Sequence, residues 1–254
     1  MSLFADALAW FKAKKLKISF DYRDVWKQEH THAFTVAKVM QEGILVDIKN
    51  HLDDAIEKGT TFEQFKKELT PLLQAQGWWG IKNVKDPKTG RLVKAQLGSP
   101  RRLRTIFDAN LRTARAAGQW GRFQRTKKAL PFLVYELGPS LEHRDDHVKW
   151  AGIILPIDHP FWLTHFTPNG YGCKCRIRQV SQREKDRLIK IGQYTTTAPK
   201  IEMVEWLNKR TGEVEKVPKG IDPGWDNNPG IDRDEILKKL AKESAQNFKK
   251  TFKK

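Results

Sequence analysis

The sequence predicts an α+β protein with a mainly helical N-terminal half, a small mixed α/β domain and an extended C-terminal arm. Through much of the first 124 residues, apolar side chains recur every three or four positions, which is the spacing of one helix face. Short apolar and aromatic runs follow between residues 130 and 180, as is typical of strands. We place a helical docking region at 1–98, a mixed domain with a basic helix at 99–198, and a hairpin with a basic arm at 199–254.

The composition is strongly basic. Its 47 lysine and arginine residues against 30 acidic ones give a formal net charge of +17. Such a charge favours a polyanionic partner through long-range attraction and counterion release. Nucleic acid is therefore the first candidate partner, and an acidic protein surface is the alternative.

The N-terminal sequence MSLFADALAWFKAKKLK predicts a short amphipathic helix over residues 3–13 that docks on another surface. Its apolar stretch is too short and too interrupted for a signal peptide core or a membrane span. We therefore expect a protein made in a cytosol, with no membrane partner. Cys173 and Cys175 are one residue apart and poorly placed for a mutual disulfide, so we expect them to be free or to bind a metal.

Residues 21–58 are predicted to form one long helix, or two helices joined near Gly43, because their apolar positions keep helical spacing. Gly59 would end this helix, and a threonine at position 60 or 61 would cap the next one. The segment VKDPKTGRLV then carries Asp-Pro and Thr-Gly turn signals, as expected of a hairpin or an ordered loop.

Ser99 and Pro100 predict the start of a further helix that runs to about Gln124. Serine can accept a hydrogen bond from a free backbone N–H, and proline in the first turn loses none. Around this helix, the segment from Arg91 to Lys128 has eleven basic residues and one acidic residue, Asp108.

Five arginines of this helix fall within about 80° of arc, at about 100° per residue, and the apolar residues centre on the opposite side. Because guanidinium groups suit two-point contact with phosphates, the sequence predicts a face that binds DNA or another polyanion. A merely solvated face is the alternative. We call this set the arginine stripe: Arg101, Arg104, Arg112, Arg115 and Arg122.

Three strands are predicted at Leu130–Leu137, Ile153–Ile157 and Lys174–Val180. After Arg183 the pattern is helical for one or two turns, and a hairpin is predicted around Thr211-Gly212. The segment DPGWDNNPG then leads into a lysine-rich amphipathic helix with apolar positions Ile236, Leu237, Leu240 and Phe248.

The stretch from Leu141 to Gln179 concentrates the residues able to carry chemistry, with four of the seven histidines and both cysteines. Cys173 and Cys175 could offer two thiolates to Zn²⁺, with His147 and one of His143, His159 or His165 completing a tetrahedron. We take His143 as the fourth ligand. The alternative is that the cysteines are small buried side chains at a strand start, beside histidines that hydrogen-bond to turns.

The same stretch permits a metal-dependent nuclease. In such an enzyme His147 or His165 would activate water beside a cation held by Asp145, Asp146 or Asp158. No nucleophile elbow, phosphate-binding glycine loop or paired-carboxylate motif specifies a reaction, however. A DNA-binding protein without an activity is the other alternative.

The motifs in this stretch are, in order, RxxHxxWxG, DxPFW and PNGxGCxCR. Together with GWWG, LGSPRRLRTIFDANLRTARAAGQW and DPGWDNNPG, this order and spacing resembles the phage Mu F-like head morphogenesis (minor head protein) family over nearly the whole chain. The chain departs from the family pattern at Ala151, Thr167 and Lys174, which leaves the turn and the cysteine pair intact. The motif residues are Arg144, His147, Trp150, Gly152, Pro160, Trp162, Pro168, Asn169, Gly170, Cys173, Cys175 and Arg176.

The resemblance implies that residues 99–198 hold a head-morphogenesis domain and that the protein is structural rather than an enzyme. It implies a minor capsid protein in the virion head, at or near the portal vertex, made in a host bacterial cytoplasm and present in multiple copies. The implied partners are the portal protein, the capsid shell and packaged double-stranded DNA. Zn²⁺ is the one cofactor that the residues suggest.

Overall fold

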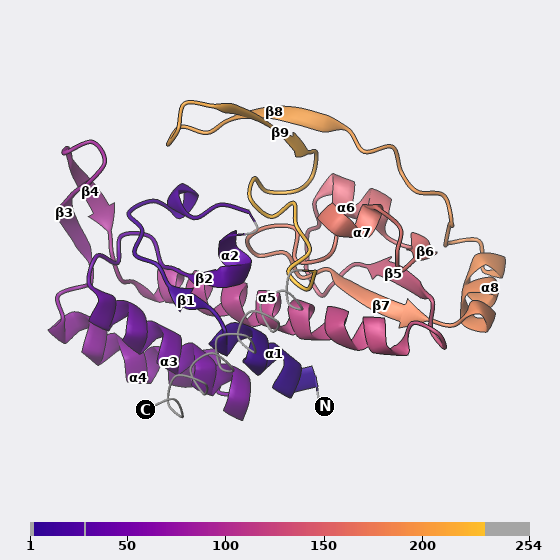
Figure 1. The fold of residues 1–254 in the computed structure, drawn as a ribbon, viewed down its shortest axis with the longest axis horizontal. Helices are drawn as coiled ribbons and strands as arrows, with labels where there is room; N and C mark the ends of the chain where they lie inside the picture. The colour runs from indigo at the N-terminus through magenta and orange to yellow at the C-terminus, as the bar shows by residue number, and fades with distance from the viewer. Residues whose placement is uncertain (1–2, 28, 232–254) are drawn as a thin grey trace, which may run out of the picture.

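The computed structural model describes residues 3–27 and 29–231 of the chain. The long helix α5 (Pro100–Thr126) runs along the molecule and links a helical part to a part built around a small sheet (Figure 1). Its predicted start is confirmed, since the Ser99 side chain accepts a hydrogen bond from the backbone N–H of Arg102 and Pro100 lies in the first turn.

The helical part consists of α1 (Leu3–Lys12), α3 (Glu42–Lys58) and α4 (Phe62–Ala75), packed with the first half of α5. The N-terminal helix docks within the chain, because α1 packs against α5 and α3. Apolar side chains from all four helices form one buried cluster, which includes Trp10, Phe11, Leu45, Ile48, Leu52, Phe65, Leu69, Leu103 and Leu111.

The predicted helix over residues 21–58 is wrong for its first half. This segment contains the 3₁₀ turn η1 (Tyr22–Asp24), α2 (Glu29–His32) and strand β2 (Ala33–Phe34), which pairs in parallel with β1 (Lys15–Leu16). Left-handed backbone at Lys27 (φ 49°) and Lys38 (φ 64°) is incompatible with a continuous helix. The apolar residues that mimicked helical spacing are nevertheless buried, namely Val25, Phe34, Val36 and Val39.

The other predicted ends and turns of this part are confirmed. Gly59 ends α3 in the left-handed conformation at φ 71°, and Thr61 caps α4 by accepting from the N–H of Gln64. Strands β3 (Ile81–Lys85) and β4 (Leu92–Gln96) form an antiparallel hairpin.

The sheet has β5 (Phe132–Glu136) at its centre, with β6 (Ile154–Pro156) and β7 (Arg176–Val180) as antiparallel neighbours. All three strands fall within the predicted segments. Leu133 and Tyr135 pack in a core with the second half of α5, whereas Val134 packs with Leu188 of α8 (Gln182–Lys190). The alternation along β5 thus buries both faces of the sheet.

Two short helices, α6 (Asp145–Trp150) and α7 (Phe161–Thr164), lie in the connections between these strands. The predicted hairpin near Thr211-Gly212 is present as β8 (Met203–Leu207) and β9 (Val214–Pro218). After β9 the chain returns to the sheet part, where Ile221 and Trp225 join its core. The helix predicted around Ile236 to Phe248 lies outside the described residues.

Helix α5 contributes to both large cores, with Leu103 to Ala117 in the helical part and Ala116, Trp120 and Phe123 in the sheet part. The divisions at 98 and 198 remain predictions. Among the described residues, no helix combines the length and the apolar character required to cross a membrane.

Candidate metal centre

Three predicted ligands meet beside the sheet. His147 lies on α6, and Cys173 and Cys175 lie in the loop that leads into β7. Nδ1 of His147 is 3.4 Å from Sγ of Cys175 and 3.9 Å from Sγ of Cys173. One ligand atom from each residue falls within 4.8 Å of the other two, and this is the one such group of His, Cys, Asp or Glu in the described part of the chain.

The orientation of the His147 ring is set by a backbone contact. Its Nε2 donates a hydrogen bond to the carbonyl oxygen of Gly220 at 2.9 Å, which leaves the lone pair of Nδ1 directed at the two sulfur atoms. The ring also stacks on Trp150, with centroids 5.0 Å apart. His147 is only 3% exposed, so this geometry is held inside the core.

The two thiols share a hydrogen bond that separates their acidities. The pKa of Cys175 is lowered, chiefly because the Cys173 thiol donates to it, with Tyr135 adding to the effect against the opposing effect of burial. The pKa of Cys173 is raised, first by this hydrogen bond and then by burial. Backbone N–H groups of Asn169 and Cys175 face the Cys173 sulfur and oppose that rise. The two thiols therefore differ in acidity, and Cys175 is the more acidic of the pair.

The other histidines considered as ligands lie elsewhere. His143 is partly exposed and outside the three-residue group. Nδ1 of His159 accepts from the N–H of Phe161 at 3.1 Å. His165 is buried, stacks on Phe161 at 4.2 Å and contacts the hydroxyl of Thr164 at 2.8 Å. His159 thus hydrogen-bonds within a turn, and His165 packs in the core.

The carboxylates that a nuclease would need are also outside the group. Asp146 pairs with Lys149, and Asp158 pairs with Lys127. Neither they nor Asp145 contribute an oxygen to the metal-ligating group of the described residues. The geometry thus gives no support to a cation held by His and Asp side chains at this place.

Beside the metal centre, Arg144 explains another part of the motif. Its guanidinium binds both carboxylate oxygens of Asp222 at 2.8 and 3.0 Å and also donates to the carbonyl of Tyr171. The backbone N–H of Tyr171 donates to the same carboxylate at 2.9 Å. The N–H of Asp222 in turn donates to the carbonyl of Asn169 at 3.0 Å. This network joins the Pro-Asn-Gly loop to the segment after β9.

Asp222 and Gly220 were not among the predicted site residues. They come from the segment after β9, 75 and 73 positions beyond His147, and no local pattern connects them with α6. The available signal was the late segment DPGWDNNPG, which begins at Asp222 and resembles a segment of the same family.

The remaining motif residues build the core around this loop. Trp162 is fully buried and donates from Nε1 to the carbonyl of Pro156 at 3.0 Å. Gly152 has φ 81°, and a side chain there would meet the carbonyl oxygen of Gln193 at 2.6 Å. Asn169 is buried and accepts from the hydroxyl of Tyr135 at 3.0 Å, whereas Arg176 is exposed and pairs with Glu136. Pro160 immediately precedes α7, and Pro168 precedes Asn169.

The arginine stripe is not uniformly free. Arg101, Arg115 and Arg122 are exposed on α5. Arg104 is exposed but lies over the ring of Phe62 at 4.2 Å. Arg112 is half-buried and donates to the carbonyl of Cys173 at 3.2 Å, so it supports the cysteine loop.

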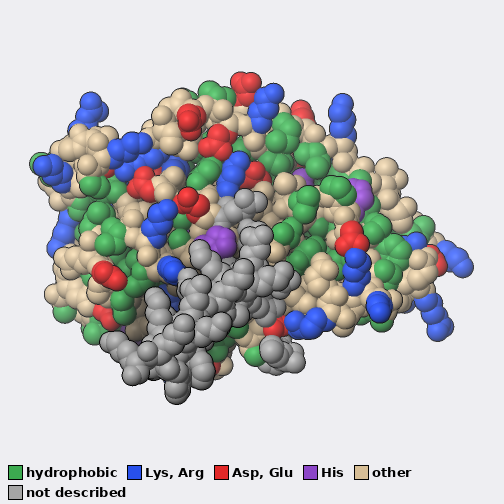
Figure 2. Space-filling view, in the orientation of Figure 1, with side chains coloured by type: hydrophobic (Ala, Val, Ile, Leu, Met, Phe, Trp, Pro, Cys, Tyr) green, Lys and Arg blue, Asp and Glu red, His purple; other side chains and the backbone are tan. Residues whose placement is uncertain are grey.

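The surface charge is distributed widely on the face drawn in Figure 2. Lysine and arginine side chains are spread among acidic and apolar ones there rather than gathered in a single patch.

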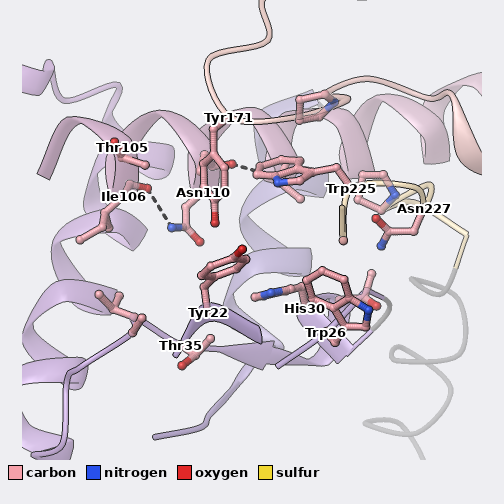
Figure 3. Close-up of a pocket in the computed structure, with 18 of the residues that line it drawn as sticks. Tyr22, Trp26, His30, Thr35, Thr105, Ile106, Asn110, Tyr171, Trp225 and Asn227 are labelled. Atoms are coloured by element: carbon pink, nitrogen blue, oxygen red, sulfur yellow. Dashed lines mark hydrogen bonds between the residues drawn. The ribbon is translucent and has the colours of Figure 1, made fainter. Parts of the chain in front are cut away.

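A second feature is an aromatic pocket of about 310 Å³ between the two parts of the molecule. Tyr171 and Trp225 line one side of it and Tyr22 and Trp26 the opposite side, with Asn110 of α5 between them (Figure 3).

Two basic side chains of this pocket, Lys14 and His30, have shifted acidities. The pKa of Lys14 is lowered to about 7 by burial and by the charge of Lys49, although its Nζ donates to the carbonyl of His30 at 2.6 Å. The pKa of His30 is lowered to about 4 by burial and by Lys14. Residues of the helical part and residues within 223–229 both line the pocket, which therefore lies where the helical part meets the segment after β9.

Comparison with known proteins agrees with the motif. The family model described as Phage Mu protein F like protein matches residues 46–178. The chain is 32% identical over 236 residues to the putative capsid assembly protein F of Escherichia phage Mu, covering 89% of this chain and 54% of that protein. It is 34% identical over 199 residues to the Mu-like prophage FluMu F protein of Haemophilus influenzae, covering 78% of this chain and 47% of that protein.

The chain spans about half the length of these curated relatives. No solved structure matches it. Both the family model and the similarity to the phage Mu protein cover more than half of the chain, and the motif residues from Arg144 to Arg176 lie within the matched segment. The chain therefore belongs to the family of phage Mu protein F like proteins.

Proposed function

We propose that this chain is a minor capsid protein that acts in the assembly of a Mu-like phage head. It would be a structural component of the virion, located near the portal vertex in multiple copies, and it would contact the portal protein, the capsid shell and packaged DNA. The observation that carries the proposal is the similarity to a protein named for capsid assembly, which extends over 89% of this chain.

The architecture suits such a place. The protein combines two cores along one continuous helix with a net charge of +17, and this charge would favour a position between a protein ring and DNA. Arg101, Arg115 and Arg122 are the exposed members of the arginine stripe for which no internal acidic partner is recorded among the described residues. We assign the DNA contact to these three.

The location is tested by quantitative mass spectrometry of purified, nuclease-treated particles. The chain should be found at a few to a few tens of copies when measured against the portal and major capsid proteins. Its absence from particles, with abundant protein in the lysate, would overturn the proposal of a virion component.

The DNA contact is tested by changing Arg101, Arg115 and Arg122 together to Gln. If each neutralises one phosphate, the slope of log affinity against log salt should become shallower by about 2.7 for duplex DNA, and affinity at low salt should fall. Arg104 and Arg112 are left unchanged because they contact Phe62 and the cysteine loop.

A matched control removes the same charge from exposed lysines outside α5, at Lys67, Lys200 and Lys216. Salt-titrated fluorescence anisotropy with a labelled duplex measures both variants. An equal loss in the two would mean that only net charge matters, and an unchanged affinity in the stripe variant would exclude the stripe as the DNA-binding face.

A further inference from the structure

We propose that His147, Cys173 and Cys175 bind one Zn²⁺ ion through Nδ1 and the two Sγ atoms. The ion would join α6 to the loop before β7. It would have a structural role, and the proposal does not depend on the function proposed above.

The distances between the ligand atoms suit a tetrahedral zinc. With Zn–N near 2.0–2.1 Å and Zn–S near 2.3 Å, a tetrahedral centre separates nitrogen and sulfur ligands by about 3.6 Å. The two separations here are 3.4 and 3.9 Å, one on each side of that value. The side chains therefore need only small movements to bind the ion.

The contacts behind the ligands are those of a metal site. Zinc-bound histidines usually donate from the second ring nitrogen to a carbonyl or carboxylate, and Nε2 of His147 donates to Gly220. Arg112 donates to the carbonyl of Cys173 and so orients the cysteine loop from α5. The ligands are thus supported from two distant parts of the sequence, α5 and the segment after β9.

The donor set selects zinc among common ions. Two sulfur atoms and one imidazole nitrogen are borderline or soft ligands, whereas Mg²⁺ and Ca²⁺ prefer oxygen. No carboxylate of the described residues joins the group. Burial of the Cys173 thiol and the His147 imidazole in an aromatic core is also costly unless their polar atoms are satisfied, and coordination would satisfy both.

We assign the fourth position to a water molecule. Among the described residues, no further His, Cys, Asp or Glu atom completes the group. The amide nitrogen of Asn169 is buried and lacks a hydrogen-bond partner there, while its amide oxygen accepts from Tyr135. Because Tyr135 also interacts with Cys175, this free N–H lies at the edge of the site and could donate to a bound water.

The test uses the full chain, purified without a histidine tag under reducing conditions. Elemental analysis should find about one zinc per chain. Replacement of zinc by Co²⁺ should give tetrahedral d–d bands and a thiolate-to-cobalt charge-transfer band, which reports sulfur ligation directly. Cys173→Ser and Cys175→Ser should each lose most of the bound metal and weaken or remove the charge-transfer band.

His143→Ala is the matched control, since His143 is a nearby histidine of the same stretch that lies outside the group. It should keep about one metal per chain and the cobalt spectrum of the unchanged protein. Loss of metal in this variant would overturn the ligand set proposed here.

The cobalt titration of the unchanged protein keeps the test independent of whether the serine variants fold. A protein that is purified free of metal and develops no charge-transfer band with added Co²⁺ would overturn the zinc site. The cluster would then be a hydrogen-bonded pair of thiols beside a histidine.

Discussion

At the scale of single residues, the most connected contact of the motif is the ion pair between Arg144 and Asp222. Two guanidinium nitrogens of Arg144 each donate to one carboxylate oxygen of Asp222. The backbone N–H of Tyr171 donates to the same carboxylate. Both side chains are about one-third exposed, so the charge attraction alone contributes little to stability. Its value lies in fixing the loop that carries Asn169 and Gly170 against the segment after β9.

Gly170 tests this arrangement. A Cβ atom at position 170 would lie 2.3 Å from Oδ2 of Asp222 and 2.6 Å from Nη1 of Arg144. Gly170→Ala should therefore displace the ion pair and lower the free energy of unfolding by about 1–3 kcal/mol, measured by urea denaturation.

Gly172→Ala is the control for Gly170→Ala. Gly172 has φ 74°, but nothing lies within 4 Å of its added Cβ. This change should cost only the strain of left-handed backbone, about 1 kcal/mol. A smaller loss at position 170 than at 172 would contradict the close approach to Asp222.

His165 should make stability sensitive to acid. Burial lowers its pKa from 6.5 to about 4, and the nearby His147 acts in the same direction. Between these two values the unfolded chain binds a proton that the folded chain does not. The contribution of His165 is therefore complete above pH 6.5 and is lost as the pH falls towards 4, by up to about 3 kcal/mol.

His165→Phe keeps an aromatic ring against Phe161 and removes the titrating group. The variant should lose less of its unfolding free energy than the unchanged protein between pH 7 and pH 4.5, as measured by urea denaturation at each pH. The same change at the partly exposed His143 is the control for replacing a histidine by phenylalanine. Parallel curves for His165→Phe and the unchanged protein would refute this assignment.

At the scale of elements, α5 has the most clearly defined start. Its first turn carries basic residues and no acidic one, which is unfavourable at the positive end of a helix dipole. The Ser99 cap is therefore the main local stabilisation of this end. Ser99→Ala should lower the free energy of unfolding by about 1 kcal/mol.

Ser99→Asp separates capping from other effects of the mutation at that site. An aspartate retains the hydrogen-bond acceptor and adds a negative charge beside Arg101 and Arg102, so this variant should be at least as stable as the unchanged protein. Thermal unfolding of both variants gives the comparison. If the aspartate variant were as destabilised as the alanine variant, the cap would not be the cause.

The two faces of α5 carry different roles. The arginine stripe was predicted as one exposed face. Arg112 of that set is instead half-buried and donates a hydrogen bond to the carbonyl of Cys173. The spacing of residues along a helix gives the direction of a side chain. It does not reveal which neighbouring loop will meet that side chain.

At the scale of the whole molecule, the chain after β7 returns to both parts of the structure. Arg210 binds Asp24 at 2.6 Å and Asp86 at 2.6 Å, and Trp206 stacks on Trp26 with centroids 5.1 Å apart. Gly220 then contacts His147. The region expected as an extended arm is thus, through residue 231, an integral strap across the molecule.

Much of this structure follows from local patterns. The capping residues Thr61 and Ser99, the turn at Gly59 and the strand segments were predictable because they depend on hydrogen bonds and periodicities within a few residues. The segment 21–41 was not, because its buried apolar residues keep helical spacing by coincidence while left-handed backbone at Lys27 and Lys38 breaks the helix.

By itself, the sequence determined the α+β class, the long basic helix and the choice of His147, Cys173 and Cys175 as candidate ligands. The tertiary structure decided that these three meet while His143 stays outside, and that Gly220 and Asp222 support the site. The physical reason is the separation along the sequence of the residues that make each contact. Helices, caps and turns are set by neighbours a few residues away, whereas the site depends on contacts between segments 26 to 78 residues apart.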